Sequence, residues 1–248
     1  MAYTFDYLGG EFSAAHFRKS IAAAEAAAPD GWICLAFSNH DVVRHVSRWA
    51  THGQQAAFTR LAATLLLAMR GSVCLYQGEE LGLKEAELAF EDLVDPYGIE
   101  FWPQFKGRDG CRTPMVWQAH AANGAFSTAN RTWLPVPAEH LLHAVDTQDG
   151  VDGSVLEFYR ALLAFRKVHP ALVKGSIELL EAPADILAFI RDNGEECLLC
   201  VFNMGETAVD YALPAGLAPH DAGCPGVIAA VIEGEIDLEP FGAYIGIL

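Results

Sequence analysis

Two short polar clusters hold most of the residues that could do chemistry, and each directly follows an apolar run. The first is in FSNHDVVRHVSR, residues 37–48, where Asn39, His40 and Asp41 follow the run WICLAF. The second, QGEELG, follows the run SVCLY and contains Glu79. Amide, imidazole and carboxylate groups gathered in this way can cap a helix, bind a metal ion or bind a polar substrate, so three interpretations are open.

The positions of these clusters favour an active site. WICLAF and SVCLY are continuous apolar runs, which are typical of parallel strands buried on both faces. Parallel α/β proteins bind ligands at the carboxyl ends of their strands, so we expect both clusters at one rim. Neighbouring residues of an extended segment diverge, and no HxxxH or Cys/His partner follows Asp41, so we expect neither a metal nor a cofactor. Helix capping by Asp41 stays an alternative.

The elements that must position the clusters alternate between strand and helix. Apolar and aromatic runs predict strands over residues 3–7, 32–37 and 72–76. Helical spacing, with Ser13 as a cap and Gly or Pro at the ends, predicts helices over residues 14–28, 54–71 and 154–169. This order is typical of a parallel α/β fold. The polar stretch 84–152 is long for a connector and indicates a functional loop.

The pattern changes after about residue 174. Short alternating or apolar runs follow, separated by turn signals such as Asn-Gly and Pro-Gly: SIELLEA, ILAFIRD, CLLCVFN, AVDYAL, GVIAAVI and GAYIGIL. They predict a small antiparallel β domain. We therefore divide the chain into an α/β part, residues 1–173, and a β domain, residues 174–248.

The composition limits the possible partners. The net charge of −16 argues against nucleic acid and against an anionic membrane, because both bind clustered Lys and Arg. No apolar stretch approaches the length of a membrane span, and the N-terminus lacks the pattern of a secretory signal. Cys197 and Cys200 would face opposite sides of a strand, so we do not expect them to share a metal. Free cysteine is often a small buried hydrophobic residue, and the six cysteines are expected to be reduced. We therefore expect a cytoplasmic protein.

Three segments resemble motifs of the α-amylase family, glycoside hydrolase family 13. FSNHDVVR resembles the segment after the seventh barrel strand, and RGSVCLYQGEELGL the eighth-strand region. DPYGIEFWPQFKGRDGCRTPMVW, residues 95–117, resembles the long insertion that follows in the family's α-glucosidases, and RTPMxW is a signature of the oligosaccharide-cleaving branch. The resemblance implies that residues 1–173 are the C-terminal part, about strands six to eight, of a (β/α)8 TIM barrel, followed by a β-sandwich.

The resemblance also implies roles for individual residues. The family cleaves α-glucosidic bonds with retention, using an aspartate nucleophile and a glutamate acid/base. By its place in NHD, Asp41 is similar to the third carboxylate, which binds sugar hydroxyls and stabilises the oxocarbenium-like transition state. Substrate-binding roles are implied for His40, Arg112, Asn39, Glu79 and Phe101. For Glu79 a structural role in the GEE turn stays open, as does a packing role for Phe101.

Two parts of the family's catalytic machinery do not occur in the sequence. Neither the nucleophile segment GFRxDxxN nor a convincing general-acid glutamate is present. A TIM barrel needs eight strands, and only three are predicted here. We therefore expect the chain to be the C-terminal part of a longer enzyme, with the N-terminal half of the barrel as its partner, and to be inactive alone.

Several functions are compatible with this resemblance. The first expectation is an α-glucosidase that acts on short α-glucosides such as maltose or sucrose. An α-1,6-glucosidase and a sucrose-handling transglycosylase are alternatives within the same chemistry. A non-catalytic barrel relative that acts as a binding or assembly partner is another, but such a scaffold would not need the acid at Asp41.

Overall fold

A computed structural model gives the structure of the chain and describes residues 2–50, 53–227 and 229–248. The contacts group the chain into two compact units. The first unit comprises residues 1–35, 52–74 and 158–248, and the second comprises residues 36–51 and 75–157. This grouping differs from the predicted division at residue 173, which stays a prediction.

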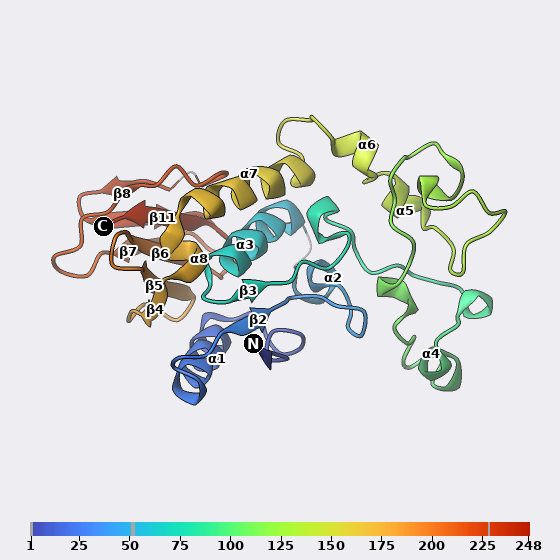
Figure 1. Cartoon of the computed structure of the whole chain (residues 1–248), viewed down its shortest axis with the longest axis horizontal. Helices are drawn as coiled ribbons and strands as arrows, with labels where there is room; N and C mark the ends of the chain where they lie inside the picture. Colours follow the sequence, from blue (N-terminus) through green and yellow to red (C-terminus); the bar gives the residue numbers. More distant parts are fainter. Residues whose placement is uncertain (1, 51–52, 228) are drawn as a thin grey trace. The chain divides into compact units, whose positions relative to one another are not determined.

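A three-stranded parallel sheet lies in the first unit, in the order β1-β2-β3 (Figure 1). The strands are β1 (Ala2–Tyr3), β2 (Ile33–Leu35) and β3 (Ser72–Val73). Cys34 of β2 is the register partner of Tyr3 on one side and of Ser72 on the other. The prediction of parallel strands is confirmed, with β2 and β3 shorter than their predicted ranges. β1 shares only Tyr3 with the predicted strand 3–7.

Two helices connect these strands, α1 (Ala14–Ala27) and α3 (Gln55–Ala68). The Ser13 side chain accepts a hydrogen bond from the backbone N–H of His16, so the predicted cap of α1 is confirmed. The apolar residues that predicted α3, such as Phe58 and Leu65, are buried. Two further helices follow the long loop, α7 (Val155–Val168) and α8 (Pro170–Lys174).

The rest of the first unit consists of two antiparallel sheets. The order β4-β5-β6-β11-β8 joins Ser176–Leu179, Ile186–Asp192, Cys197–Asn203, Ala243–Ile247 and His220–Asp221. The order β7-β10-β9 joins Val209–Ala212, Glu235–Leu238 and Val231–Ile232. The antiparallel prediction is confirmed, whereas β8 and β10 were not predicted. Residue 228, inside the predicted run GVIAAVI, lies outside the described residues.

One apolar cluster receives side chains from both antiparallel sheets. Ile186, Leu199 and Val201 come from the five-stranded sheet, and Tyr211 and Ile236 come from the three-stranded sheet. Each is at most 2% exposed. Burial of these side chains is the main force that stabilises such a pair of sheets. All six cysteines are free thiols, in agreement with the prediction.

Two arginines, of which Arg191 is buried, bond to the carboxyl-terminal end of α3. Arg191 of β5 is 0% exposed and donates to the carbonyl oxygen of Ala68, the last residue of the helix. Arg166 of α7 donates to the carbonyl oxygens of Leu67 and Gly71. The last carbonyl groups of a helix have no partners within the helix, so these guanidinium groups satisfy them.

The second unit holds the polar residues that the sequence singled out. Its described residues contain no strand. Its helices are α2 (His45–Trp49), α4 (Pro96–Glu100), α5 (Ala138–Leu141) and α6 (Val145–Gln148), and its 3-10 turns are η1 (Glu79–Leu81), η2 (Phe90–Asp92), η3 (Asp109–Cys111) and η4 (Ala122–Ala125). A small apolar core supports them, formed by Leu81, Leu83, Val116, Ala144 and Leu156.

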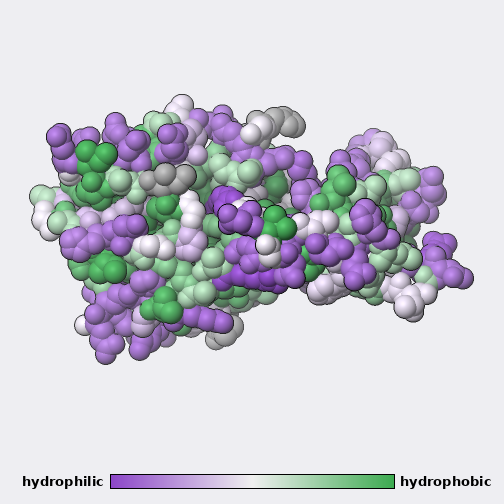
Figure 2. Space-filling model, turned by 90° about the horizontal axis from the view of Figure 1, so that it is seen from above, coloured by the Kyte–Doolittle hydropathy of each residue, from purple (hydrophilic) through white to green (hydrophobic). Residues whose placement is uncertain are grey.

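The surface mixes hydrophilic and hydrophobic residues. On the face shown in Figure 2, hydrophobic residues form small groups between hydrophilic ones. Large exposed hydrophobic side chains are scattered along the chain, for example Phe5, Leu142 and Ile232. Within residues 2–50, 53–227 and 229–248, the structure has no helix with the length and apolar character of a membrane span.

Candidate functional site

A tight turn presents the NHD segment. The backbone N–H of Asp41 donates to the side-chain oxygen of Asn39 at 2.8 Å, which is the bond of an Asx-turn. The turn leaves the side chains of His40 and Asp41 67% and 47% exposed. The next helix begins at His45 after Arg44, and its N-terminus has no side-chain cap hydrogen bond. The capping alternative for Asp41 is therefore wrong.

Arg112 holds this turn at two points. Its Nε donates to the carbonyl oxygen of His40 at 2.6 Å, and its Nη2 donates to Oδ1 of Asp41 at 2.9 Å. A planar guanidinium can make both bonds at once, so it fixes the backbone and the carboxylate together. The structure thus brings together Asn39, His40, Asp41 and Arg112, four of the six predicted site residues.

A second arginine, which the sequence analysis missed, reaches the same carboxylate. Nη1 of Arg108 lies 3.1 Å from Oδ1 of Asp41. Arg108 and Arg112 flank the turn η3, in the segment GRDGCRTPM. The four-residue spacing of two arginines was the signal in the sequence, but only the arginine of RTPM was assigned a role.

Arg108 is itself held by a buried carboxylate. Its Nε and Nη2 donate to the two carboxylate oxygens of Asp95, both at 2.9 Å. The hydrogen bonds from Arg108 lower the pKa of Asp95 to about 2, so Asp95 is ionised near neutral pH. Asp95 also begins α4, where its side chain accepts a bond from the N–H of Tyr97.

The two oxygens of Asp41 have different surroundings. Both arginines donate to Oδ1, whereas Oδ2 lies 3.4 Å from Nε2 of His40. The hydrogen bonds from the two arginines orient the carboxylate. A half-exposed carboxylate beside an imidazole can bind neighbouring hydroxyl groups of a sugar and can stabilise a positive charge that develops near them.

Glu79 lies apart from this arrangement. Its side chain is 1% exposed, and its Oε1 lies 3.5 Å from Nδ1 of His45. Glu79 begins the turn η1, where the side chain of Glu80 accepts a bond from the N–H of Gly78. These contacts favour the structural alternative for Glu79, and direct contact with a sugar stays a prediction.

Phe101 is also outside the cluster around Asp41. It lies at the C-terminal end of α4, where its N–H donates to the carbonyl oxygen of Tyr97 at 3.0 Å, and it is 53% exposed. Its neighbour Trp102 packs against Phe90, with 5.7 Å between the ring centres. The role of Phe101 as a wall of the sugar site stays a prediction.

Arg44, which follows the same predicted strand as Asp41, has a structural position. It is 1% exposed and donates to the carbonyl oxygens of Gln77 and Cys111, at 2.6 and 3.1 Å. The hydroxyl of Tyr76 also donates to the Cys111 carbonyl, at 3.0 Å. These bonds tie the NHD, QGEE and RTPM segments to one another.

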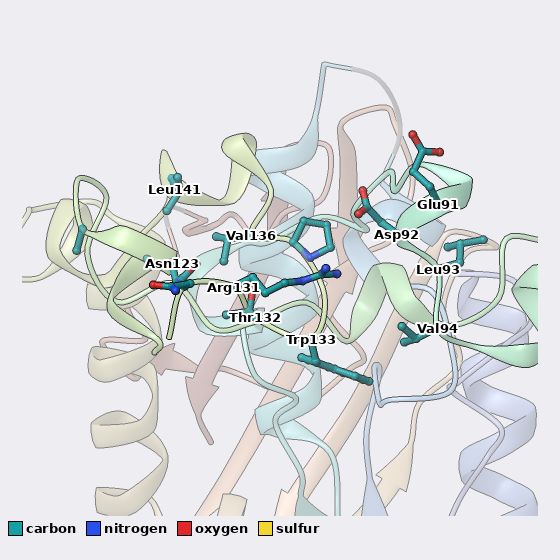
Figure 3. Close-up of a pocket in the computed structure, with 14 residues that line it drawn as sticks. Glu91, Asp92, Leu93, Val94, Asn123, Arg131, Thr132, Trp133, Val136 and Leu141 are labelled. Carbon is teal, nitrogen blue, oxygen red and sulfur yellow. The ribbon is translucent and has the colours of Figure 1, made fainter. Parts of the chain in front are cut away.

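The second unit also contains a pocket of about 530 Å³ (Figure 3). Figure 3 shows Arg131 and Trp133 on one side and Asp92 and Val94 on the other. None of the six predicted site residues lines it. Among the described residues, the structure has no cluster of three or more His, Cys, Asp or Glu side chains that could hold a metal ion.

Comparisons with known proteins find a family model and curated relatives that match this chain. The model of the α-amylase catalytic domain matches residues 6–175. A probable α-glucosidase of Rhizobium meliloti (strain 1021) is 48% identical over 247 residues, which cover 98% of this chain and 44% of that protein. An oligo-1,6-glucosidase of Parageobacillus thermoglucosidasius is 32% identical over 206 residues, covering 74% of this chain and 36% of that protein.

A solved structure is similar over the whole chain. The crystal structure of XgtA, an α-glucosyl transfer enzyme, has a TM-score of 0.93 and 45% sequence identity. The match covers 100% of this chain and 46% of that one. The chain therefore spans less than half the length of each of these relatives.

Proposed function

Because the chain belongs to the α-amylase family of glycoside hydrolases, we propose that it provides part of the sugar-binding site of a retaining α-glucosidase. The substrates proposed are short α-glucosides such as maltose or sucrose. The observation that carries this proposal is the Asp41 carboxylate, with Oδ1 held by Arg108 and Arg112 and Oδ2 facing His40.

Asp41 acts on the transition state in this proposal. Retaining cleavage builds positive charge on the sugar ring as the glycosidic bond breaks. A carboxylate held in place before the reaction stabilises that charge without the cost of reorganising water. Arg112 and Arg108 orient Asp41, and His40 and Asn39 shape the turn that presents it. The nucleophile and the acid/base come from polypeptide that the family places N-terminal to the NHD segment.

The strands and sheets can also be assigned to parts of the family's fold. We propose that β1, β2 and β3 are the sixth, seventh and eighth strands of the family's barrel, and that the two antiparallel sheets are its β-sandwich. The parallel order β1-β2-β3 and the core shared by the two sheets support this assignment. Phe101 keeps its proposed role near the sugar, whereas the buried position of Glu79 beside His45 supports a structural role for it. The free cysteines support a reducing compartment such as the cytoplasm.

Glucosyl transfer is a second candidate. It uses the same covalent intermediate as hydrolysis, but a sugar hydroxyl instead of water attacks it. The 45% identity to an α-glucosyl transfer enzyme favours this alternative. The two reactions differ in their products, since hydrolysis of maltose releases only glucose whereas transfer also forms longer glucosides.

A chimera tests the proposal. The part of the Rhizobium meliloti protein that this chain does not match would be fused before residues 1–248, and its products from maltose and sucrose analysed. We expect activity from the chimera and none from residues 1–248 alone. We also expect Asp41→Asn to lower kcat about a hundredfold or more, because the lost interaction is made mainly in the transition state.

The test has a matched control variant, and two results would contradict the proposal. Asp210→Asn, an exposed carboxylate on β7, should leave kcat unchanged. Near-normal kcat in Asp41→Asn would remove Asp41 from the mechanism. Turnover by residues 1–248 alone would show that the chain does not need the proposed partner.

A further inference from the structure

We propose that Asp95 is a positioning residue that acts on Asp41 through Arg108. Asp95 and Asp41 come from different segments, and Arg108 bonds to both carboxylates. This inference rests on the proposed function, because it assigns Asp95 to the site that Asp41 forms.

The first step is the contact between Asp95 and Arg108. Two parallel hydrogen bonds of 2.9 Å join the guanidinium to both oxygens of the carboxylate, and the backbone N–H of Arg108 adds a third bond at 2.8 Å. The side chain of Asp95 is 0% exposed. A bidentate pair of this geometry fixes the plane of the guanidinium as well as its position.

The second step is the rigidity of Asp95 itself. The backbone N–H groups of Val94 and Asp95 both donate to Oδ2 of the buried Asp109, at 2.7 and 2.8 Å. Gly107 packs so closely that a Cβ atom there would lie 2.8 Å from Cα of Gly98 and 2.9 Å from Oδ2 of Asp95. The loop around Asp95 therefore has little room to shift.

The third step is the orientation that Arg108 receives. With Nε and Nη2 bound to Asp95, Nη1 points to Asp41 and donates to Oδ1 at 3.1 Å. The guanidinium also lies over the ring of Tyr97, 5.3 Å from its centre. A free arginine side chain samples many rotamers, so this support holds the positive charge beside Asp41 before a substrate arrives.

A purely structural ion pair is the competing explanation. Such a pair would stabilise the loop, and its loss would lower the melting temperature without a specific effect on turnover. A positioning residue must also change the behaviour of Arg108 and, through it, the kinetics. The two explanations differ in whether Asp95 and Arg108 act as one unit.

The experiment uses the chimera described above and three variants, Asp95→Asn, Arg108→Gln and the double substitution. We expect Asp95→Asn to lower kcat/KM between about tenfold and a hundredfold, because Arg108 loses its orientation. The double variant should be no worse than Arg108→Gln alone, since Asp95 acts through Arg108. Glu87→Gln, which removes an exposed ion pair with Lys106 in the same loop, should leave kcat/KM unchanged.

A second readout does not depend on activity. Phenylglyoxal modifies accessible arginines, and the modified peptides can be quantified by mass spectrometry on residues 1–248 as well as on the chimera. A guanidinium held at both ends reacts slowly. We expect Asp95→Asn to raise the modification rate of Arg108 several-fold and Glu87→Gln to leave it unchanged.

Each result decides the inference. Unchanged modification of Arg108 in Asp95→Asn would overturn it, and so would additive kinetic effects in the double variant. If Asp41→Asn is strongly impaired, a normal kcat/KM of Asp95→Asn would also overturn the inference, even if Arg108 is modified faster in that variant. If Asp41→Asn is fully active, the proposed function is wrong. Asp95 then has no effect on catalysis through Asp41. The modification rate then separately reports whether Asp95 holds Arg108.

Discussion

Arg44 and Cys111 are joined by a hydrogen bond of 3.1 Å from the guanidinium to the carbonyl oxygen, although 67 residues separate them. The same guanidinium bonds to the carbonyl oxygen of Gln77. One side chain thus connects three loop segments that have no strand pairing with one another to hold them. The geometry around Asp41 depends on these loops, so it depends on Arg44.

We predict that Arg44→Gln lowers the free energy of unfolding by about 2–4 kcal/mol, because the shorter side chain loses the buried hydrogen bonds to the carbonyl oxygens of Gln77 and Cys111. Urea unfolding followed by tryptophan fluorescence measures the change. Arg131→Gln removes an exposed arginine from the same unit and should change stability by less than about 0.5 kcal/mol. Equal stability of the two variants would contradict this role of Arg44.

We predict that Arg112→Lys lowers kcat/KM of the chimera between about tenfold and a hundredfold, because lysine keeps the charge but cannot hold His40 and Asp41 together. Kinetics with nitrophenyl α-glucoside measure the effect. Arg131→Lys is the matched control and should behave like the unmodified protein. Full activity of Arg112→Lys would mean that charge alone is sufficient at this position.

His140 makes stability depend on pH. It is buried, its Nε2–H donates to the carbonyl oxygen of Lys84, and Nδ1 lies 3.4 Å from the hydroxyl of Thr113. Burial lowers its pKa from 6.5 to about 4. Between these values the unfolded chain binds a proton that the folded chain does not, so stability falls as the pH falls through this window.

The corresponding prediction compares pH 7 with pH 5. The protein should lose up to about 3 kcal/mol from His140 between neutral pH and pH 4, and part of this by pH 5. His140→Gln should lose less over the same range, because glutamine does not titrate. His120→Gln, at an exposed position, should behave like the unmodified protein. Parallel pH profiles for the unmodified protein and His140→Gln would refute the assignment.

Asn203, the last residue of β6, is 0% exposed and organises the turn that follows. Its Nδ2 donates to the carbonyl oxygens of Thr207, Leu238 and Glu239, and its Oδ1 accepts from the N–H of Gly205. We predict that Asn203→Ala lowers the free energy of unfolding by about 2–4 kcal/mol, because these buried groups lose their partner. Thermal unfolding measures the loss, and Asp210→Asn should not reproduce it.

The sequence predicted the elements whose signals are local. Ser13 caps α1 as expected, and β5 and β6 have the bounds of their apolar runs. β8 and β10 were missed for a physical reason. β8 has only two residues and forms by pairing with β11, and β10 places Glu235 and Asp237 on its exposed side. Strands that depend on distant partners leave a weak pattern in the sequence.

The site residues that belong to sequence motifs were predictable. Asp41 and Arg112 belong to quoted motifs, and the structure joins them. Arg108 and Asp95 were not predicted, because their bond depends on how an irregular loop folds and no periodicity encodes that path. The burial of Glu79 was not predictable either, because the turn QGEELG has the composition of an exposed segment.

The bond from Arg191 to the end of α3 has a consequence for how the first unit unfolds. The buried guanidinium of Arg191, on β5, donates to the carbonyl oxygens of Ala68 in α3, of Gly175 and of Ser176. Separating the sheet from α3 would leave the buried guanidinium of Arg191 without one of its acceptors. We therefore expect α3 and the five-stranded sheet to unfold together in one cooperative transition.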